Sequence, residues 1–114
     1  MTFEELAEFK KDLKKLSRKY RTLNDDFDIV KKVLKVYPGE RPPFSFRIEG
    51  LGIQDCVIKV KKIASKSFKG KGVNSGFRII YAHFEIEQRI VFIEIYHKAD
   101  KEIEDRERIK KYFQ

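Results

Sequence analysis

The feature that most constrains the fold of this chain is a change in the spacing of its apolar residues. Over the first third they recur every three or four positions, as they do along one face of an α-helix. One stripe comprises Phe3, Leu6, Phe9, Leu13, Leu16 and Tyr20, and a second comprises Phe27, Val30, Val33, Leu34 and Tyr37. Because few residues separate the stripes, they predict two helices folded back on each other as an antiparallel hairpin.

The limits of these helices follow from their flanking residues. Thr2 and Glu5 have the spacing of a capping box, which predicts a first helix that runs to about Tyr20. Asn24 or Asp25 is the expected cap of the second helix. The chain is therefore expected to enter a helix almost at once, without a preceding strand.

After the helical stripes, the pattern changes to that of β-strands. Apolar, β-branched and aromatic residues gather in four segments, which predict strands at 44–48, 56–64, 76–86 and 89–97. A Gly/Lys/Ser loop and a tight turn link the last three, so an antiparallel meander is expected. Asp100 is the expected cap of a final helix over 101–113.

These elements predict one α+β domain over residues 1–114. Its N-terminal antiparallel helical hairpin is expected to pack on a small antiparallel β-sheet, followed by a C-terminal helix. Since the hairpin covers one side of the sheet, residues that alternate to the other side are expected to be open to solvent. Lys59, Lys61, Arg78 and Tyr96 share that side and predict a concave basic and aromatic patch.

The charge of the chain supports this patch. The net charge is +8, but residues 1–40 carry ten basic and eight acidic residues, and residues 85–114 carry seven and eight. Residues 41–84 carry nine basic and two acidic residues. The stretch 56–84 has no acid and seven cations: Lys59, Lys61, Lys62, Lys66, Lys69, Lys71 and Arg78. Such concentrated positive charge predicts a polyanionic partner.

Several classes of protein are disfavoured by the composition. No apolar run approaches the roughly 20 residues of a membrane helix, and the first residues lack the pattern of a signal peptide, so a cytoplasmic protein without a membrane partner is expected. The single cysteine, Cys56, and two histidines offer no metal-ligand spacing. The loop "GKGVNSG" lacks the Gly-Lys-Ser/Thr ending of a phosphate-binding P-loop. No metal or cofactor is predicted.

Four stretches together resemble the RelE/ParE superfamily of toxins from type II toxin-antitoxin systems. They are "EFKKDLKKLSRKYRTLNDDFDIV", "VIKVKK", "SGFRIIY" and "IEIYHKADKE". The resemblance implies a RelE-like fold. For the RelE branch it also implies cleavage of messenger RNA on the ribosome, through attack of a 2'-hydroxyl on the adjacent phosphorus. A cognate antitoxin, the ribosome and messenger RNA are the implied partners.

The resemblance also implies roles for individual residues. Lys59 and Lys61 would bind phosphate and assist proton removal, and Arg78 would hold the scissile phosphate. Tyr96 and His97 match a Tyr/His pair near the end of the last strand, with His97 the better general acid or base because its unperturbed pKa lies near neutrality. Further RNA contacts are expected from Lys62, Lys66, Lys69, Lys71, Lys98 and Lys101.

Two departures from the RelE pattern keep other hypotheses open. Ala99 stands where that branch has a second catalytic arginine, which Lys101 could replace in charge but not in bidentate geometry. The expected lack of an initial strand would leave a sheet edge for an antitoxin segment. A ParE-like inhibitor of DNA gyrase and a non-catalytic RNA- or protein-binding member are therefore alternatives. Phe68 could either stack on a base or be buried.

Overall fold

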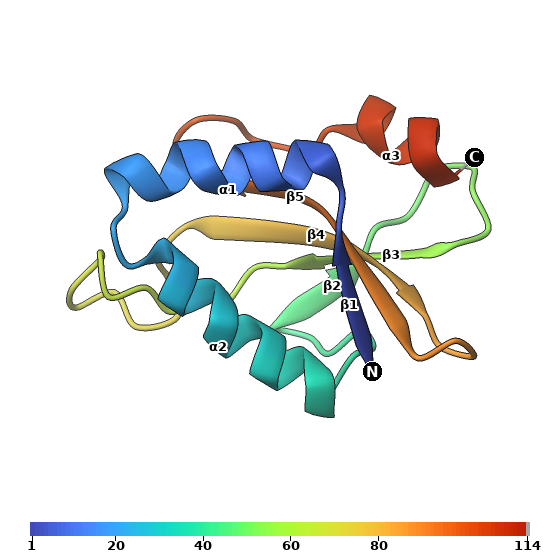
Figure 1. The fold of residues 1–114 in the computed structure, drawn as a ribbon, viewed down its shortest axis with the longest axis horizontal. Coiled ribbons are helices and arrows are strands. Elements are labelled where there is room, and N and C mark those ends of the chain that lie inside the picture. The colour runs from blue at the N-terminus through green and yellow to red at the C-terminus, as the bar shows by residue number, and fades with distance from the viewer. Residues whose placement is uncertain (114) are drawn as a thin grey trace.

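A computed structural model describes residues 1–113 and shows three helices and one five-stranded sheet (Figure 1). The elements in chain order are β1 (Thr2–Glu5), α1 (Ala7–Lys19), α2 (Leu23–Val36), β2 (Ser45–Arg47), β3 (Cys56–Val60), β4 (Phe77–Phe84), β5 (Arg89–His97) and α3 (Arg106–Phe113). The predicted α+β class is confirmed. So is the expected hairpin of two helices ahead of the meander β3, β4 and β5, whose neighbours pair antiparallel.

The sheet is mixed rather than wholly antiparallel. Its strand order is β1-β5-β4-β3-β2, and β1 runs parallel to β5 while the other neighbours are antiparallel. The first residues of the chain, in β1, thus lie beside β5, which is much later in the sequence (Figure 1). The outer edge of β5, which we expected to be free for an antitoxin segment, is therefore occupied by β1.

Strand β1 corrects the prediction that a helix begins at Thr2. The Phe3 ring stacks on Phe92 of β5 with 5.9 Å between centroids, and the Leu6 amide donates to the Phe92 carbonyl at 3.0 Å. Helix α1 starts only at Ala7. The spacing of Thr2 and Glu5 fits a capping box, but pairing with β5 satisfies the same backbone groups and buries part of Phe3.

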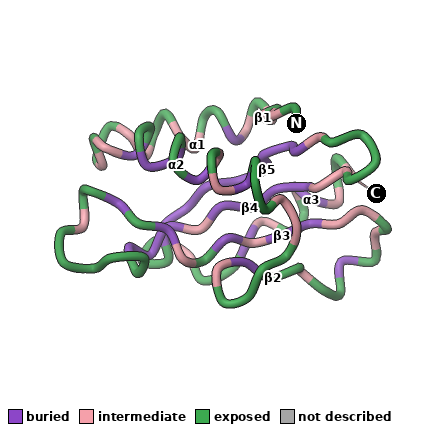
Figure 2. The backbone as a smooth tube through the Cα atoms, turned by 90° about the horizontal axis from the view of Figure 1, so that it is seen from below, coloured by how far each residue is buried: buried purple, intermediate pink, exposed green. Residues whose placement is uncertain are grey.

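Helices α1 and α2 cover one face of the sheet and form the first core. Phe9 of α1 and Phe27 of α2 pack against each other and against Phe92, with ring centroids 4.8–5.4 Å apart. The Tyr81 hydroxyl donates to the Pro38 carbonyl at 2.6 Å and ties the end of α2 to β4. Figure 2 shows that buried residues concentrate in β4, β5 and the facing turns of the helices.

The opposite face of the sheet is also covered, contrary to the prediction that it is open. Ile80 and Ala82 of β4 are fully buried there, together with Ile93 of β5. Ile109 of α3 and Leu51 of the β2–β3 connection pack over them. The predicted alternation of faces holds along β4, but in β5 a register shift puts Ile93 on the same face as Tyr96. A second core fills much of the surface expected to be a basic patch.

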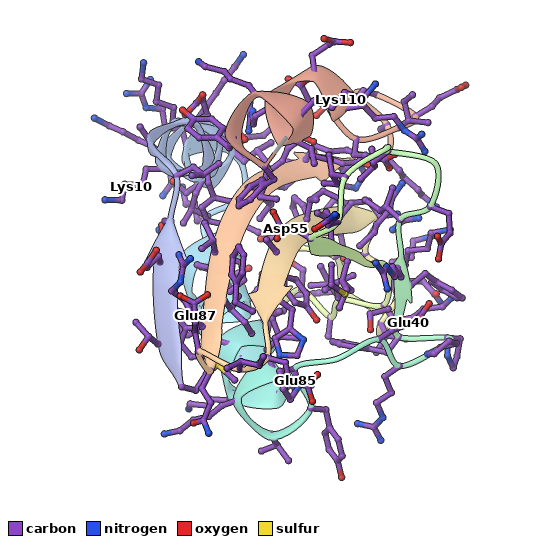
Figure 3. The ribbon with its side chains drawn as sticks, turned by 90° about the vertical axis from the view of Figure 1, so that its right-hand side faces the viewer. Lys10, Glu40, Asp55, Glu85, Glu87 and Lys110 are labelled. Carbon is purple, nitrogen blue, oxygen red and sulfur yellow. The ribbon has the colours of Figure 1, made fainter. Side chains whose placement is uncertain are left out.

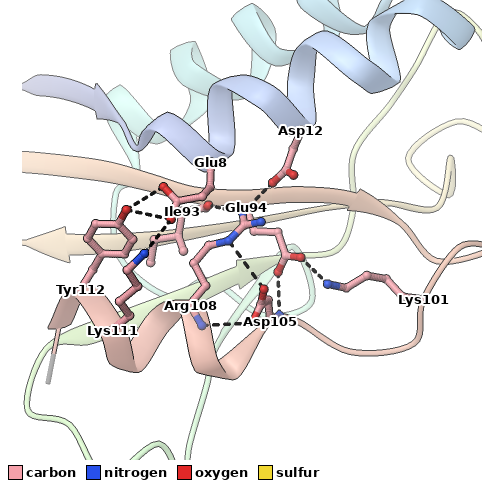
Figure 4. Close-up of polar contacts among 9 residues, drawn as sticks. All are labelled: Glu8, Asp12, Ile93, Glu94, Lys101, Asp105, Arg108, Lys111 and Tyr112. Carbon is pink, nitrogen blue, oxygen red and sulfur yellow. Dashed lines mark hydrogen bonds and ion pairs between the residues drawn. The ribbon is translucent and has the colours of Figure 1, made fainter.

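Helix α3 is clamped onto both β5 and α1 (Figure 4). The Arg108 guanidinium donates to the Asp12 carboxylate at 2.6 Å and to the Ile93 carbonyl at 2.8 Å. The helix begins at Arg106 rather than at 101, because Glu94 binds the preceding segment through the Asp105 amide at 2.8 Å. The cap is Asp105, whose carboxylate accepts from the Arg108 amide at 3.0 Å, and the predicted cap Asp100 is wrong.

Candidate polyanion-binding groove

A concavity of about 350 Å³ lies where β2, the end of β3, the start of β4 and the segment after β5 meet. We call it the basic groove. Its lining residues are Pro43, Phe46, Lys61, Lys62, Asn74, Gly76, Arg78 and Lys98. Four of these eight residues are cationic and none is acidic, so the groove matches the acid-free stretch of the sequence and adds Lys98 to it.

Arg78 is the second residue of β4 and lies beside the groove. Its side chain is half-buried, and it pairs with Tyr96 of β5 in the register. One of its terminal nitrogens donates to the Lys61 carbonyl at 3.1 Å and to the Phe77 carbonyl at 3.2 Å. A guanidinium has five N–H donors. Two backbone contacts therefore fix the orientation of the side chain while leaving donors available to an anion.

The three lysines of the groove are not neutralised. The Lys61 ammonium lies 5.3 Å from the centroid of the Phe46 ring, and the Lys62 ammonium donates to the Asn74 amide oxygen at 2.9 Å. Within residues 1–113 no carboxylate lies within ion-pair distance of Lys61, Lys62, Lys98 or Arg78. Cations gathered in a concave surface without acids attract phosphate groups.

Lys59 lies on the predicted face but is already paired. Its ammonium contacts the Glu104 carboxylate at 3.0 Å, and Glu104 is buried and also accepts from Arg106 at 2.9 Å. Burial raises the pKa of Glu104, but the hydrogen bonds from Lys59, its own backbone and Arg106 outweigh it and leave that pKa below its ordinary value. Glu104 thus occupies the position at which Lys59 would meet a phosphate.

Tyr96 and Lys101 lie outside the basic groove. The Tyr96 ring is buried on the face covered by α3, with the ammonium groups of Lys59 and Lys101 at 5.7 and 5.1 Å from its centroid. Its hydroxyl is buried without a hydrogen-bond partner among the described residues. Lys101 forms an ion pair with Glu94 (Figure 4). Tyr96, Lys59 and Lys101 thus lie near one another, but none of the three lines the basic groove with Arg78.

His97 lies on the other face of the sheet, against the helical hairpin. Its ring is buried and stacks on Phe68 at 5.2 Å and on Tyr20 at 5.9 Å. Nδ1 accepts from the Ala99 amide at 3.1 Å, so in the neutral ring Nε2 carries the hydrogen and donates to the Ser75 carbonyl at 2.8 Å. Both nitrogens are engaged, and the imidazole is separated from Arg78 by the sheet.

The loop between β3 and β4 presents three of the predicted RNA-binding residues, Lys66, Lys69 and Lys71, all of them exposed. Its base is anchored by the buried Asp26 carboxylate, which accepts from the Ser65 hydroxyl at 2.6 Å. Phe68 packs against both His97 and Tyr20, whose rings also stack on each other. The ring of Phe68 is partly buried and packs against the core, which favours the second of the two alternatives.

A larger, apolar concavity of about 590 Å³ adjoins the basic groove and shares Pro43 and Lys62 with it. It runs between α2, the segment before β2 and the segment after β3, and Ile29 and Val73 in its lining are half-exposed. The one carboxylate in its lining, Asp26, is occupied by the loop contacts just described. It therefore offers apolar surface but no free catalytic group.

Several acidic side chains lie at the end of the molecule away from the basic groove. Figure 3 looks toward this end, where Asp55, Glu85 and Glu87 project from the loop before β3 and from the β4–β5 turn. Cys56 and His83 are opposite each other in the register near this end, and burial raises the pKa of the thiol, which keeps it protonated near neutral pH. In the described part of the chain, no three His, Cys, Asp or Glu side chains gather as a metal-binding set.

No protein-family model matches the chain, and no curated protein matches it either. None of the helices in the described residues is long and apolar enough to cross a membrane.

Proposed function

We propose that this protein is a RelE-like toxin of a type II toxin-antitoxin module, which binds messenger RNA on the ribosome and cleaves it. The observation that carries the proposal is the basic groove, in which Arg78 is oriented by two backbone carbonyls among three unpaired lysines. A groove without carboxylates suits the phosphate backbone of RNA. The toxin would act in the cytoplasm and be held inactive by a cognate antitoxin.

The groove supplies part of the chemistry of phosphate cleavage. During attack of a 2'-hydroxyl, charge builds on the phosphate oxygens, and a planar guanidinium is suited to stabilise it. The 2'-proton must also be removed and the leaving 5'-oxygen protonated. Lys61 and Lys98 line the groove beside Arg78 and are the candidate groups for these proton transfers, one as a neutral amine that takes the 2'-proton and the other as an ammonium that protonates the 5'-oxygen. His97 is not, because both of its nitrogens are engaged.

Strand β1 strengthens the resemblance to the RelE/ParE superfamily. That superfamily usually begins with a strand before its first helix, and the sequence suggested that this chain lacks one. The chain has it, at Thr2–Glu5. One of the two departures from the family pattern is thereby removed, while Ala99 remains.

A second candidate is a member that binds RNA without cleaving it. Two observations favour it: Lys59 is neutralised by Glu104, and His97 is closed into the core. Such a protein would use Arg78 and the lysines for affinity alone. Cleavage products, and not binding, distinguish the two candidates.

The test is primer extension on messages from cells induced briefly for the wild type, Arg78→Ala, Lys61→Ala and the control Lys10→Ala. Lys10 is exposed on α1 (Figure 3), and it is not among the residues that line the groove. Cleavage within translated codons that is lost in the two groove variants and kept in the control supports the nuclease. RNA binding without cleavage ends supports the second candidate. Growth arrest with intact messages and no RNA binding overturns both and directs the search to gyrase.

A further inference from the structure

The ring of Phe46 faces the basic groove from an edge strand. Its side chain is 36% exposed, and it belongs to neither core. The neighbouring residues fix the strand: the Ser45 hydroxyl accepts from the Arg41 amide at 2.9 Å, and the Glu40 carboxylate accepts from the Arg47 amide at 2.8 Å. The ring is thus held at the surface by a backbone anchored on both sides.

Two other aromatic side chains in the described chain are as exposed as this one, and neither has such surroundings. Tyr37 lies at the end of α2, covered by the Arg41 guanidinium at 3.9 Å, and Tyr112 donates to the Glu8 carboxylate. Phe68, the base-stacking candidate from the sequence, is packed against His97. Phe46 is therefore the exposed ring that lies in the basic groove, among cations that form no ion pair with a carboxylate.

The position of Phe46 relative to Arg78 suits a nucleotide chain. The two residues stand on β2 and β4, which flank β3, so their backbones are about 10 Å apart across the sheet. Between them lies Lys61, whose ammonium sits over the Phe46 ring. An aromatic platform beside a track of cations is the arrangement by which proteins bind single strands, with the base on the ring and the phosphates on the cations.

We infer that Phe46 is a base-stacking subsite and that the ligand of the basic groove is a single-stranded nucleic acid, an inference that rests on the proposed function. Phosphate contacts go to Arg78 and Lys98, and Lys61 moves from the ring to a phosphate when a base takes its place. In a duplex both faces of each base are already stacked, so the ring gains nothing from it. The subsite therefore selects unpaired RNA.

The experiment measures fluorescence anisotropy with three labelled probes: a short single-stranded RNA, a strand of the same length with abasic residues, and an RNA duplex. The variants are Phe46→Leu, which keeps an apolar side chain, and the control Tyr37→Leu outside the groove. We expect Phe46→Leu to weaken binding of the single-stranded RNA about tenfold. Its affinity for the abasic strand and the duplex should stay at the wild-type value, and Tyr37→Leu should change none of the three.

Two results would overturn the subsite while leaving the proposed function in place. They are an unchanged affinity of Phe46→Leu for single-stranded RNA, and an equal loss on the abasic strand, which would mean that the ring only shapes the groove. If the wild type binds none of the probes, the proposed RNA function fails as well. The chain has no tryptophan, so Phe46→Trp gives a direct readout: stacking should quench its fluorescence on addition of RNA, whereas the abasic strand should not.

Discussion

Gly76 lies directly against the imidazole of His97. A Cβ atom added to Gly76 would come within 2.6 Å of Nε2 and 2.9 Å of Cε1 of that ring, and Gly76 has a φ of +95°. Nε2 is the atom that donates to the Ser75 carbonyl. The lack of a side chain at Gly76 thus lets the His97 ring pack against the residue that precedes β4. Gly76 also lines the basic groove.

Gly76→Ala is therefore expected to destabilise the fold. The added methyl group must displace the His97 ring, and alanine is strained at this φ, which together should lower the free energy of unfolding by about 1–3 kcal/mol. Urea denaturation measures the change. Gly39→Ala is the matched control, because nothing lies within 4 Å of a Cβ at Gly39 and its φ is not positive. Equal stability of the two variants would contradict the packing described for His97.

The pair of Lys59 and Glu104 predicts a dependence of stability on pH. The pKa of Glu104 is lower in the folded protein than its ordinary value of 4.5, so its ionised form stabilises the fold above that pH. This stabilisation is lost as the pH falls through the lowered pKa. Glu104→Gln should cost about 1–3 kcal/mol at neutral pH, and its difference from the wild type should shrink as the solution becomes acidic.

Chemical denaturation at several pH values between neutral and strongly acidic tests this expectation. Glu102→Gln serves as the control, because Glu102 is exposed and forms no ion pair in the described chain. A constant difference between Glu104→Gln and the wild type at every pH would show that the carboxylate is not ionised in the way the pair requires.

The sequence predicts contacts between residues that are close in the chain better than contacts between residues that are far apart in it. The hairpin and the meander follow from local spacing, and their predicted positions agree with the structure to within a few residues. Strand β1 does not, since its pairing with β5 joins Thr2 to Arg89. The stretch "TFEEL" has helical spacing through Phe3 and Leu6, and only pairing with its distant partner makes it a strand.

The candidate site shows the same limit. Arg78, Lys61 and Lys62 could be found because an acid-free stretch of sequence carries them. Glu104 could not, because 45 residues separate it from Lys59 and its neighbours are mostly charged. Phe46 lies within a predicted strand, and its exposure follows from the position of β2 at the edge of the sheet.

Removal of the Arg78 guanidinium should change the salt dependence of RNA binding as well as its strength. Each phosphate contact to a single strand contributes about 0.7 to the slope of log affinity against log salt concentration, so Arg78→Ala should lower that slope by about this amount. Anisotropy titrations over a range of salt concentrations give the slope. Lys10→Ala should leave it at the wild-type value, and a full slope in Arg78→Ala would remove Arg78 from the set of phosphate contacts.

Two ion pairs hold α3 against α1, and their removal should lower the free energy of unfolding by different amounts. Arg108 is mostly buried and also donates to the Ile93 carbonyl, so Arg108→Leu should destabilise the protein by about 1–3 kcal/mol. Lys111 is 68% exposed in its contact with Glu8, and exposed pairs contribute at most about 1 kcal/mol. Thermal unfolding ranks the variants, and hydrogen exchange in α3 shows whether Arg108→Leu releases the helix. A larger effect of Lys111→Leu would refute this account.

The parallel pairing of β1 with β5 has a consequence for synthesis of the chain. Residues 2–5 are synthesised before their partners at 89–92, with more than 80 residues between them. Until those partners are added α1 has no β5 to pack against, and such long-range pairing slows folding. The cations of the groove, which extend as far as Lys98, are completed at the same stage. A nascent chain therefore does not display the complete anion-binding surface before Lys98 has left the ribosome.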